Sequence, residues 1–148
     1  MKIRRADKND IDDMIRLRKA QLIDEGLSPV GIIDEECRRF FNDMFDQERI
    51  VEFLVEDENQ IIATAAVVFY DFPPTYSNTT GRKGYVTNMY THPDYRHQGI
   101  ATKLLGLIDQ TALEHGITHL WLGASKMGEP VYRHCGYDTT NVWLDKKL

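Results

Sequence analysis

The sequence predicts an α/β fold in which a mixed, largely antiparallel twisted sheet is flanked by helices. Three observations predict it. Residues 51–56 place Val51, Phe53 and Val55 at every second position, which is typical of a half-buried strand. Residues 61–70 form a longer, nearly continuous apolar run, which is typical of a central strand. Elsewhere apolar residues recur at helical spacing, so we expect helices to cover the sheet.

The N-terminal third predicts one strand and two helices. Residues 3–6 suit a short strand, and Asp7 follows as a helix N-cap, with Asp10 three residues later as in a capping box. The helix continues through residues 11–22, and Gly26 suits its end. A second helix is predicted by an apolar stripe at positions i, i+3, i+4, i+7 and i+8, which consists of Cys37, Phe40, Phe41, Met44 and Phe45.

The remaining elements alternate between strands and helices. Polar residues 57–60 supply a turn, so segments 51–56 and 61–70 are expected to form a hairpin. Residues 71–83 form a loop because they contain two prolines and a glycine. The later elements are predicted, in order, at Tyr85–Thr91 (strand), Gly99–His115 (helix), Ile117–Leu122 (strand), Val131–Cys135 (helix) and Val142–Leu144 (strand). No linker or internal repeat interrupts them, so we expect a single domain over residues 1–148.

Composition excludes several classes of protein. Of the residues, 42% are hydrophobic and 28% charged, as in an ordinary globular domain. The formal net charge of -5 argues against a nucleic-acid partner, which would need a basic face. No apolar run approaches the length of a membrane span, and no secretory signal is present, so neither membrane association nor export is expected. We expect a cytoplasmic protein whose two cysteines, Cys37 and Cys135, are thiols.

The functional signal lies where the predicted strand Tyr85–Thr91 leads into the next helix. The first backbone N–H groups of a helix have no intrahelical partner, and the helix dipole adds positive charge there. Gly99 at that point would let a ligand approach the backbone closely. Such a site suits a pyrophosphate. Neither the glycine pattern of a P-loop nor that of a dinucleotide fold is present, so those nucleotide sites are not supported.

This stretch resembles the acetyl-CoA motif of the GNAT superfamily of N-acetyltransferases. In that family a strand ending in any residue and then proline precedes an Arg or Gln, two residues, a Gly, one residue, and a Gly or Ala. Here His92-Pro93 is followed by the hexapeptide Arg96-His97-Gln98-Gly99-Ile100-Ala101. Two further segments resemble family motifs in the correct order: Arg4, Ala6 and Asp10 at the first helix, and Tyr132-Arg133-His134-Cys135-Gly136-Tyr137 near the C-terminus.

The resemblance implies an acetyl-CoA-dependent enzyme with direct transfer and no metal. Main-chain groups of Met89, Tyr90 and Thr91 would bind the pantetheine arm like an added strand. Tyr132 would protonate the departing CoA thiolate. The pyrophosphate would be held by the helix start, for which the resemblance implies the cofactor-binding residues Arg96, His97, Gln98, Gly99, Ile100, Ala101 and Thr102.

The sequence departs from the family at the general base and after the fifth strand. Many relatives carry a glutamate near the start of the fourth strand, but residues 85–88 contain no carboxylate. A water relayed by Asn88 or Tyr85 could replace it, as could Asp71 or Glu129. Many relatives also carry an asparagine after the fifth strand, which is absent from this chain's shorter segment of residues 123–129, where Ser125 is a weak substitute.

We therefore predict acetyl transfer to a primary amine of a small molecule, amino acid or peptide. Another acyl-CoA or another nucleophile is the main alternative within enzymes, and a non-catalytic acyl-CoA-binding or sensing domain is the alternative outside them. The five histidines show no metal-ligand spacing, so no metal is expected. The exposed edge of the last strand would allow pairing with a second copy, which makes a homodimer a candidate assembly.

Overall fold

The computed structural model describes residues 1–140 and 142–148. Two short 3-10 helices lie at Lys8–Asp10 and at Pro93–Tyr95. The strands are β1 (Lys2–Arg5), β2 (Ile50–Asp57), β3 (Gln60–Asp71), β4 (Arg82–Thr91) and β5 (Leu120–Trp121). The α-helices are α1 (Ile11–Asp24), α2 (Asp34–Asp46), α3 (Ile100–Glu114) and α4 (Glu129–His134).

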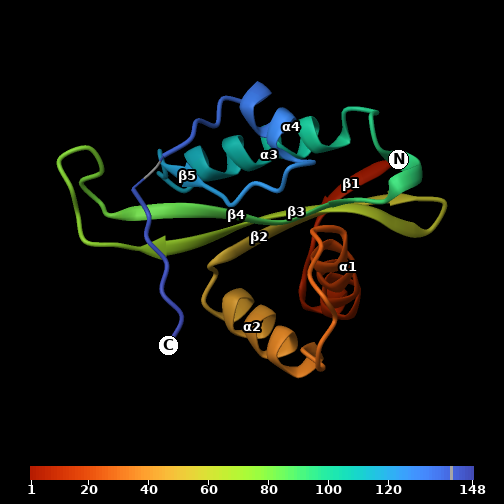
Figure 1. Ribbon diagram of the computed structural model, residues 1–148. Coiled ribbons are helices and arrows are strands. Elements are labelled where there is room, and N and C mark those ends of the chain that lie inside the picture. Colours follow the sequence, from red (N-terminus) through yellow and green to blue (C-terminus); the bar gives the residue numbers. More distant parts are fainter. Residues whose placement is uncertain (141) are drawn as a thin grey trace.

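The five strands form one sheet in the order β1-β2-β3-β4-β5. Strands β1 to β4 pair antiparallel, whereas β5 runs parallel to β4. Helices α1 and α2 cover one face of this sheet, and α3 and α4 cover the other (Figure 1). The predicted mixed, largely antiparallel sheet flanked by helices is confirmed.

The central strand β3 separates two apolar cores. Its side chains alternate between faces, as a strand requires. Val67 and Phe69 pack with α3, in a cluster that includes Leu104 and Ile108, whereas Val68 packs with α1 and α2. The continuous apolar run therefore arises because both faces of β3 are covered.

The N-terminal elements follow the predicted pattern closely. The Asp7 side chain accepts from the Asn9 amide, and Asp10 accepts from the Asp7 amide in return, so the capping box is present. Asp10 also receives two hydrogen bonds of 2.8 Å from the Arg4 guanidinium, which lowers the pKa of its carboxyl group. In α2 the predicted stripe is only partly buried, because Phe41 is enclosed while Phe40 is 38% exposed.

Two predictions for the C-terminal part are wrong. The strand expected at Ile117–Leu122 is a ladder of two residues, because β5 diverges from β4 beyond the pairs Gly84–Leu120 and Tyr85–Trp121. The strand expected at Val142–Leu144 is not formed. Instead the exposed segment 142–148 runs away from the sheet (Figure 1), and Trp143 stacks on Trp121 at a centroid distance of 6.0 Å. The short β5 leaves no long neighbouring ladder for such a strand to join.

Within the described residues, no helix is long and apolar enough to cross a membrane.

Candidate active site

The divergence of β4 and β5 opens the centre of the site. The two strands meet at Gly84, where an added Cβ would lie 2.5 Å from Leu120 Cδ2 and 2.9 Å from Val67 Cγ2, so any other residue would displace these side chains. Past Tyr85, no strand among the described residues pairs with the edge of β4 that faces β5. The two strands therefore splay, which leaves main-chain groups of β4 free to pair with an extended ligand.

A bulge in β4 adjoins this open edge. Thr64 pairs with Tyr90 and Ala66 with Thr87, so two residues of β4, Asn88 and Met89, face a single residue of β3. Asn88 adopts a left-handed backbone conformation with φ 53°. A bulge leaves its extra residue outside the ladder and turns the strand. The bulge therefore changes the direction of β4 immediately before the segment predicted to bind the pantetheine arm.

The start of α3 has the features of an anion site. Gly99 is its N-cap and has a left-handed conformation with φ 78°, and His97 also has a positive φ of 62°. No side chain caps this helix end in the described part of the chain. A Cβ added at Gly99 would meet nothing within 4 Å. The helix dipole and the uncapped amides point into open space that an anion could occupy.

Arg96 braces the loop before α3. Its Nε donates to the carbonyl of Thr91 at 2.9 Å, and its Nη2 lies 2.8 Å from the Asp24 carboxylate of α1. These contacts join the end of β4 to the end of α1. Arg96 is only 23% exposed, so its guanidinium is already engaged by protein groups. Gln98 makes one contact at 3.5 Å with the Asp94 carbonyl.

A cavity of about 460 Å³ joins the β4 edge, the α3 start and the end of α1. Of the predicted site residues, Gln98 alone does not line it. The residues predicted from the sequence that line it are Met89, Tyr90, Thr91, Arg96, His97, Gly99, Ile100, Ala101, Thr102 and Tyr132. The α1 side of the same cavity is lined by Gln21, Asp24 and Glu25, which the sequence did not single out.

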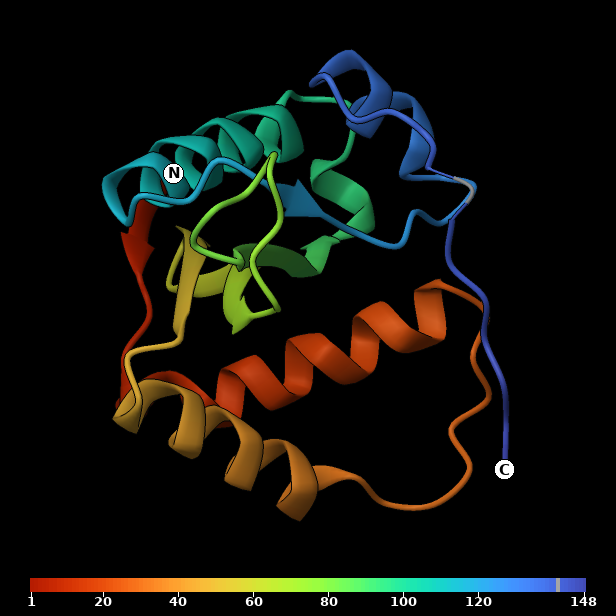
Figure 2. The ribbon, with the colours of Figure 1, turned by 90° about the vertical axis from the view of Figure 1, so that its left-hand side faces the viewer.

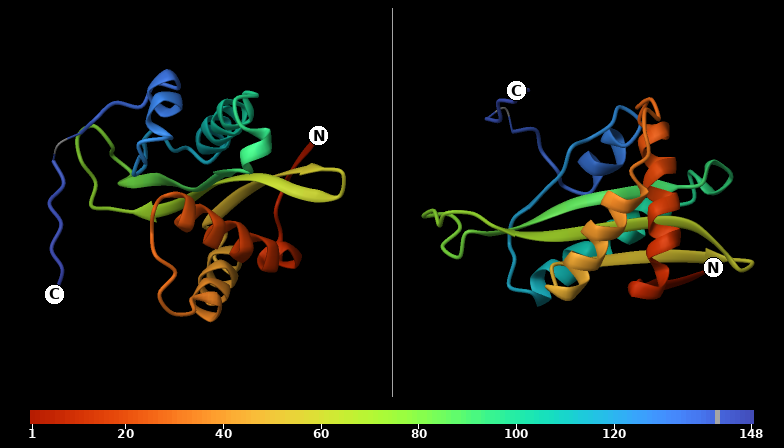
Figure 3. Two further views of the ribbon diagram at one scale, coloured as in Figure 1. Left: turned by 45° about the vertical axis from the view of Figure 1, so that its right-hand side comes forward. Right: turned by 90° about the horizontal axis from the view of Figure 1, so that it is seen from below.

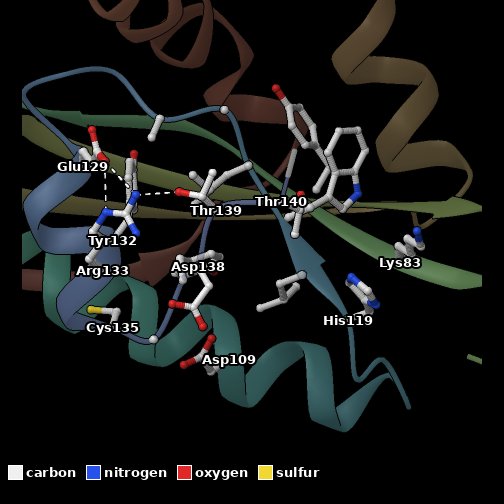
Figure 4. Close-up of a pocket in the computed structure, with 18 of the residues that line it drawn as sticks. Lys83, Asp109, His119, Glu129, Tyr132, Arg133, Cys135, Asp138, Thr139 and Thr140 are labelled. Carbon is white, nitrogen blue, oxygen red and sulfur yellow. Dashed lines mark hydrogen bonds and ion pairs between the residues drawn. The ribbon is translucent and has the colours of Figure 1, made fainter. Parts of the chain in front are cut away.

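Tyr132 projects from α4 between two cavities. It lines the cavity just described and a second one of about 760 Å³ beside β5, α3 and residues 136–140 (Figure 4). In that second cavity the polar side chains of α4 are paired, since Arg133 contacts both Glu129 at 2.9 Å and Thr139 at 2.6 Å. Tyr132 is 9% exposed. Burial, together with the charge of Glu25 and the nearby Tyr85, raises its pKa to about 12, so the phenol stays protonated at neutral pH.

The carboxylates considered as a general base are already engaged elsewhere. Asp71 pairs with Arg49 at 2.9 Å and Arg82 at 3.6 Å, and these cations hold the pKa of its carboxyl group low. Glu129 pairs with Arg133. Ser125 accepts from the Gly128 amide, which makes it part of the turn before α4.

Glu52 was not among the residues predicted from the sequence to lie in the site. This β2 residue is 1% exposed, and its carboxylate accepts from Thr64 at 2.7 Å and from Asn88 Nδ2 at 3.1 Å. Burial raises its pKa to about 7, against the lowering effect of the two hydrogen bonds. In the sequence, Glu52 is one of the residues that alternate with Val51, Phe53 and Val55, as in many strands. Its polar partners lie on β3 and β4, so only the pairing of the three strands brings these groups together.

Asn88 bridges Glu52 to helix α1. Its amide oxygen lies 3.4 Å from Arg18 Nη1, while its amide nitrogen donates to Glu52. A cation on one side and a buried carboxylate on the other specify a single orientation of the amide. Arg18 Nη1 also donates to Gln21 Oε1 at 3.1 Å. The network therefore connects the β4 bulge to the α1 wall of the cavity.

No group of three or more His, Cys, Asp or Glu side chains is arranged to hold a metal ion in the described residues. Both cysteines are half-buried free thiols. Cys37 packs against the core beside α1 and α2, and burial raises the pKa of its thiol. Cys135 packs against the core beneath α3.

Comparison with known proteins assigns the family. The model of the acetyltransferase (GNAT) family matches residues 14–137. Thialysine N-epsilon-acetyltransferase of Mus musculus is 30% identical over 144 residues, which cover 91% of this chain and 82% of that protein. The enzyme of the same name from Bos taurus is 29% identical over 143 residues, covering 90% and 82% of the two chains.

Solved structures agree with this assignment. A crystal structure of a predicted acetyltransferase with acetyl-CoA from Clostridium acetobutylicum is 49% identical, with a TM-score of 0.97 over 99% of this chain and 95% of that one. A GCN5-related N-acetyltransferase from Ralstonia eutropha, at 22% identity, shares the fold with a TM-score of 0.92 over 99% and 97%. The family model matches most of the chain, and the splayed sheet beside an uncapped helix agrees with it. This protein therefore belongs to the GNAT family and is an N-acetyltransferase.

Proposed function

We propose that this enzyme transfers an acetyl group directly from acetyl-CoA to a primary amine of a small molecule, amino acid or peptide. The observation that carries the proposal is a single cavity in which an open strand edge, an uncapped helix start and a protonated tyrosine meet. The crystal structure of the Clostridium acetobutylicum acetyltransferase with acetyl-CoA supports the choice of acyl donor.

The described residues fit the two ends of such a donor. An extended pantetheine arm can pair with the main chain of Met89 to Thr91, because β5 has already diverged from this part of β4. A pyrophosphate can accept hydrogen bonds from amides in the segment from His97 to Thr102, which begins α3 without a side-chain cap. Most of this binding uses backbone groups, so it tolerates many changes of side chain.

Tyr132 would act when the thioester carbon–sulfur bond breaks. The lone pair of the neutral amine forms the new carbon–nitrogen bond at the acetyl carbonyl, and the sulfur departs as a thiolate. The Tyr132 hydroxyl gives its proton to that thiolate, and the proton lost from the acylated nitrogen restores the phenol. With both substrates bound together, no acyl-enzyme forms.

The names of the relatives suggest a first acceptor to test. The mouse and cow enzymes are named for acetylation of the ε-amine of thialysine. We propose thialysine, lysine, polyamines, aminoglycosides and N-terminal peptides as the panel, with thialysine first. The carboxylates on the α1 side of the cavity are consistent with a cationic amine.

Release of free CoA separates the enzyme from a non-catalytic acyl-CoA-binding domain. Purified protein is given acetyl-CoA with each amine, and the thiol is measured against a sample without amine. Amine-dependent release supports the proposal. If acetyl-CoA binds by calorimetry but no amine on the panel increases CoA release, the acetyl-CoA-sensing alternative is favoured.

We also propose that a second copy of the chain is a partner. Val142, Leu144 and Leu148 are exposed by 76%, 100% and 113% on a segment that leaves the body of its own molecule. Burying these side chains against another copy would remove apolar surface from water. Sedimentation of the full chain and of a variant with Val142 and Leu144 changed to serine tests this. A monomer in both cases would contradict it.

A further inference from the structure

The α1 side of the cavity carries two carboxylates with different surroundings. Asp24 is neutralised by Arg96, whose guanidinium lies 2.8 Å from it. Glu25 makes no ion pair among the described residues. Its Oε1 accepts one hydrogen bond, from Gln21 Nε2 at 3.0 Å. The negative charge of Glu25 is therefore the one at this end of the cavity that a bound cation could neutralise.

Glu25 and Tyr132 face the same space. Both line the 460 Å³ cavity, one from the end of α1 and the other from α4. Figures 2 and 3 show the C-terminal end of α1 on the same side of the molecule as α4, although the two helices cover opposite faces of the sheet. After burial, the negative charge of Glu25 also contributes to the raised pKa of Tyr132. A molecule bound at Glu25 would thus lie close to the proposed proton donor.

The Glu25 side chain is exposed and is oriented by one hydrogen bond from a buried residue. Gln21, which donates to it, is 6% exposed and receives a hydrogen bond from Arg18. Arg18 in turn contacts Asn88, which donates to the enclosed Glu52 carboxylate. Orientation by buried neighbours lowers the entropy that a carboxylate loses on binding a ligand. Glu25 is therefore a preorganised carboxylate that could bind a cationic ligand.

The two ends of the cavity differ in charge. The start of α3 offers amide N–H groups and the positive end of a helix dipole, which suit the anionic donor. The opposite end offers the unpaired carboxylate of Glu25. An ammonium group is attracted to that end and repelled from the other.

We propose that Glu25 recognises the acceptor and selects cationic primary amines. Its carboxylate accepts a hydrogen bond from the ammonium group, which brings the acceptor to the α1 side of the cavity beside Tyr132. The ammonium group then releases one proton to the solvent that reaches the exposed Glu25, which leaves the neutral amine with the lone pair that attacks the acetyl carbonyl. Residues 85–88 of β4 carry no carboxylate. Glu25, at the end of α1, supplies a negative charge to the site in their place. This inference rests on the proposed function, because it names the acceptor side of the same site.

Glu25→Gln tests it with thialysine as the acceptor and acetyl-CoA at saturation. Glutamine is nearly isosteric and can still accept from Gln21, so only the charge is removed. We expect KM for thialysine to rise at least tenfold while kcat changes by less than about threefold and acetyl-CoA affinity stays unchanged. Added salt should raise KM of the parent enzyme and have little effect on the variant, because screening weakens the interaction that the variant lacks.

Two controls isolate the charge of Glu25. Glu36→Gln removes an exposed carboxylate of α2 outside the cavity and should leave KM as in the parent. Hydroxylamine is mostly uncharged at neutral pH, and the parent and Glu25→Gln should acetylate it at equal rates after its uncatalysed reaction with acetyl-CoA has been subtracted. An unchanged KM for thialysine in a folded Glu25→Gln enzyme would overturn the role of Glu25 alone. A parent enzyme that acetylates no amine would overturn the proposed function and this inference together.

Discussion

The two ends of the cavity are built from different parts of the chain and from different groups. The donor end consists of main-chain groups at the open edge of β4 and at the start of α3, within one continuous stretch of sequence. The acceptor end consists of side chains from α1, which are oriented by a network that reaches β2 through Asn88. A continuous backbone site leaves a motif in the sequence, whereas a site assembled from distant side chains does not.

Substitutions at the two ends of the cavity should have different effects. At the donor end, changes of side chain should matter mainly when they alter the backbone. At the acceptor end, and at Tyr132 beside it, removal of a single charge or hydroxyl should directly alter stability, the KM for the acceptor or kcat. The experiments below test this difference, from the largest expected effect to the smallest.

Glu52 should make the protein less stable as pH rises. Its pKa is raised from 4.5 to about 7 in the folded state, so between these values the folded protein binds a proton that the unfolded chain has lost. Stability from this group is therefore complete below about pH 4.5 and is lost as pH rises through 7. The loss is on the order of 3 kcal/mol. Denaturant unfolding at pH 5 and pH 8 should show it in the parent and not in Glu52→Gln.

An equal loss in the parent and in Glu52→Gln would assign the pH dependence to another group. Glu56→Gln is the matched control, because Glu56 lies on the same strand but is partly exposed and pairs with Arg4. It should behave like the parent enzyme over this pH range.

Tyr132→Phe should lower kcat by on the order of 10²-fold, as expected for loss of a general acid. The ring is kept, so acetyl-CoA affinity should change little. Because the Tyr132 pKa is raised to about 12, the phenol stays protonated through pH 10, and the parent should show no alkaline loss of activity from this group in that range. Steady-state rates from pH 6 to 10 provide the measurement. Turnover within threefold of the parent at every pH would reduce Tyr132 to a packing residue.

Gly99→Val should weaken acetyl-CoA binding at least tenfold, about 1.4 kcal/mol. An added Cβ meets open space in this structure, so the loss has two other sources. The φ of 78° is unfavourable for a β-branched residue, and the side chain would occupy space next to the proposed phosphate site. Gly99→Ala, which shares the strain with less bulk, should lose less affinity by calorimetry. Unchanged affinity in folded Gly99→Val would remove the support for this donor site.

Arg96→Ala should weaken acetyl-CoA binding less than Gly99→Val does. The guanidinium is engaged by the Thr91 carbonyl and by Asp24, which suits a brace for the loop and not a ligand for phosphate. Calorimetry at two salt concentrations measures the difference. A larger loss than for Gly99→Val would show that the donor end depends on a side-chain charge.

The donor end and the sheet were predictable because their signals are local. The apolar run of β3 and the glycine motif before α3 each reflect the conformation of adjacent residues. The missed groups, Glu52 and Glu25, gain their surroundings from strands or helices far apart in the sequence. The predicted strand at Val142–Leu144 failed for a related reason, since a strand needs a neighbouring edge, and β5 offers a ladder of only two residues.

The smallest expected effect concerns the cysteines, and it tests whether a side chain carries the acetyl group. Direct transfer needs both substrates at once, whereas an acyl-enzyme gives ping-pong kinetics. Cys37 packs against the core beside α2, and burial raises its pKa, which disfavours the nucleophilic thiolate. Cys135 lines the second cavity, on the other side of Tyr132 from the proposed donor site. Cys37→Ala and Cys135→Ala should each keep kcat within about twofold, with initial-rate plots that intersect. An acetylated Cys135 detected by mass spectrometry, together with loss of turnover in Cys135→Ala, would instead place a covalent intermediate at the C-cap of α4 and replace direct transfer.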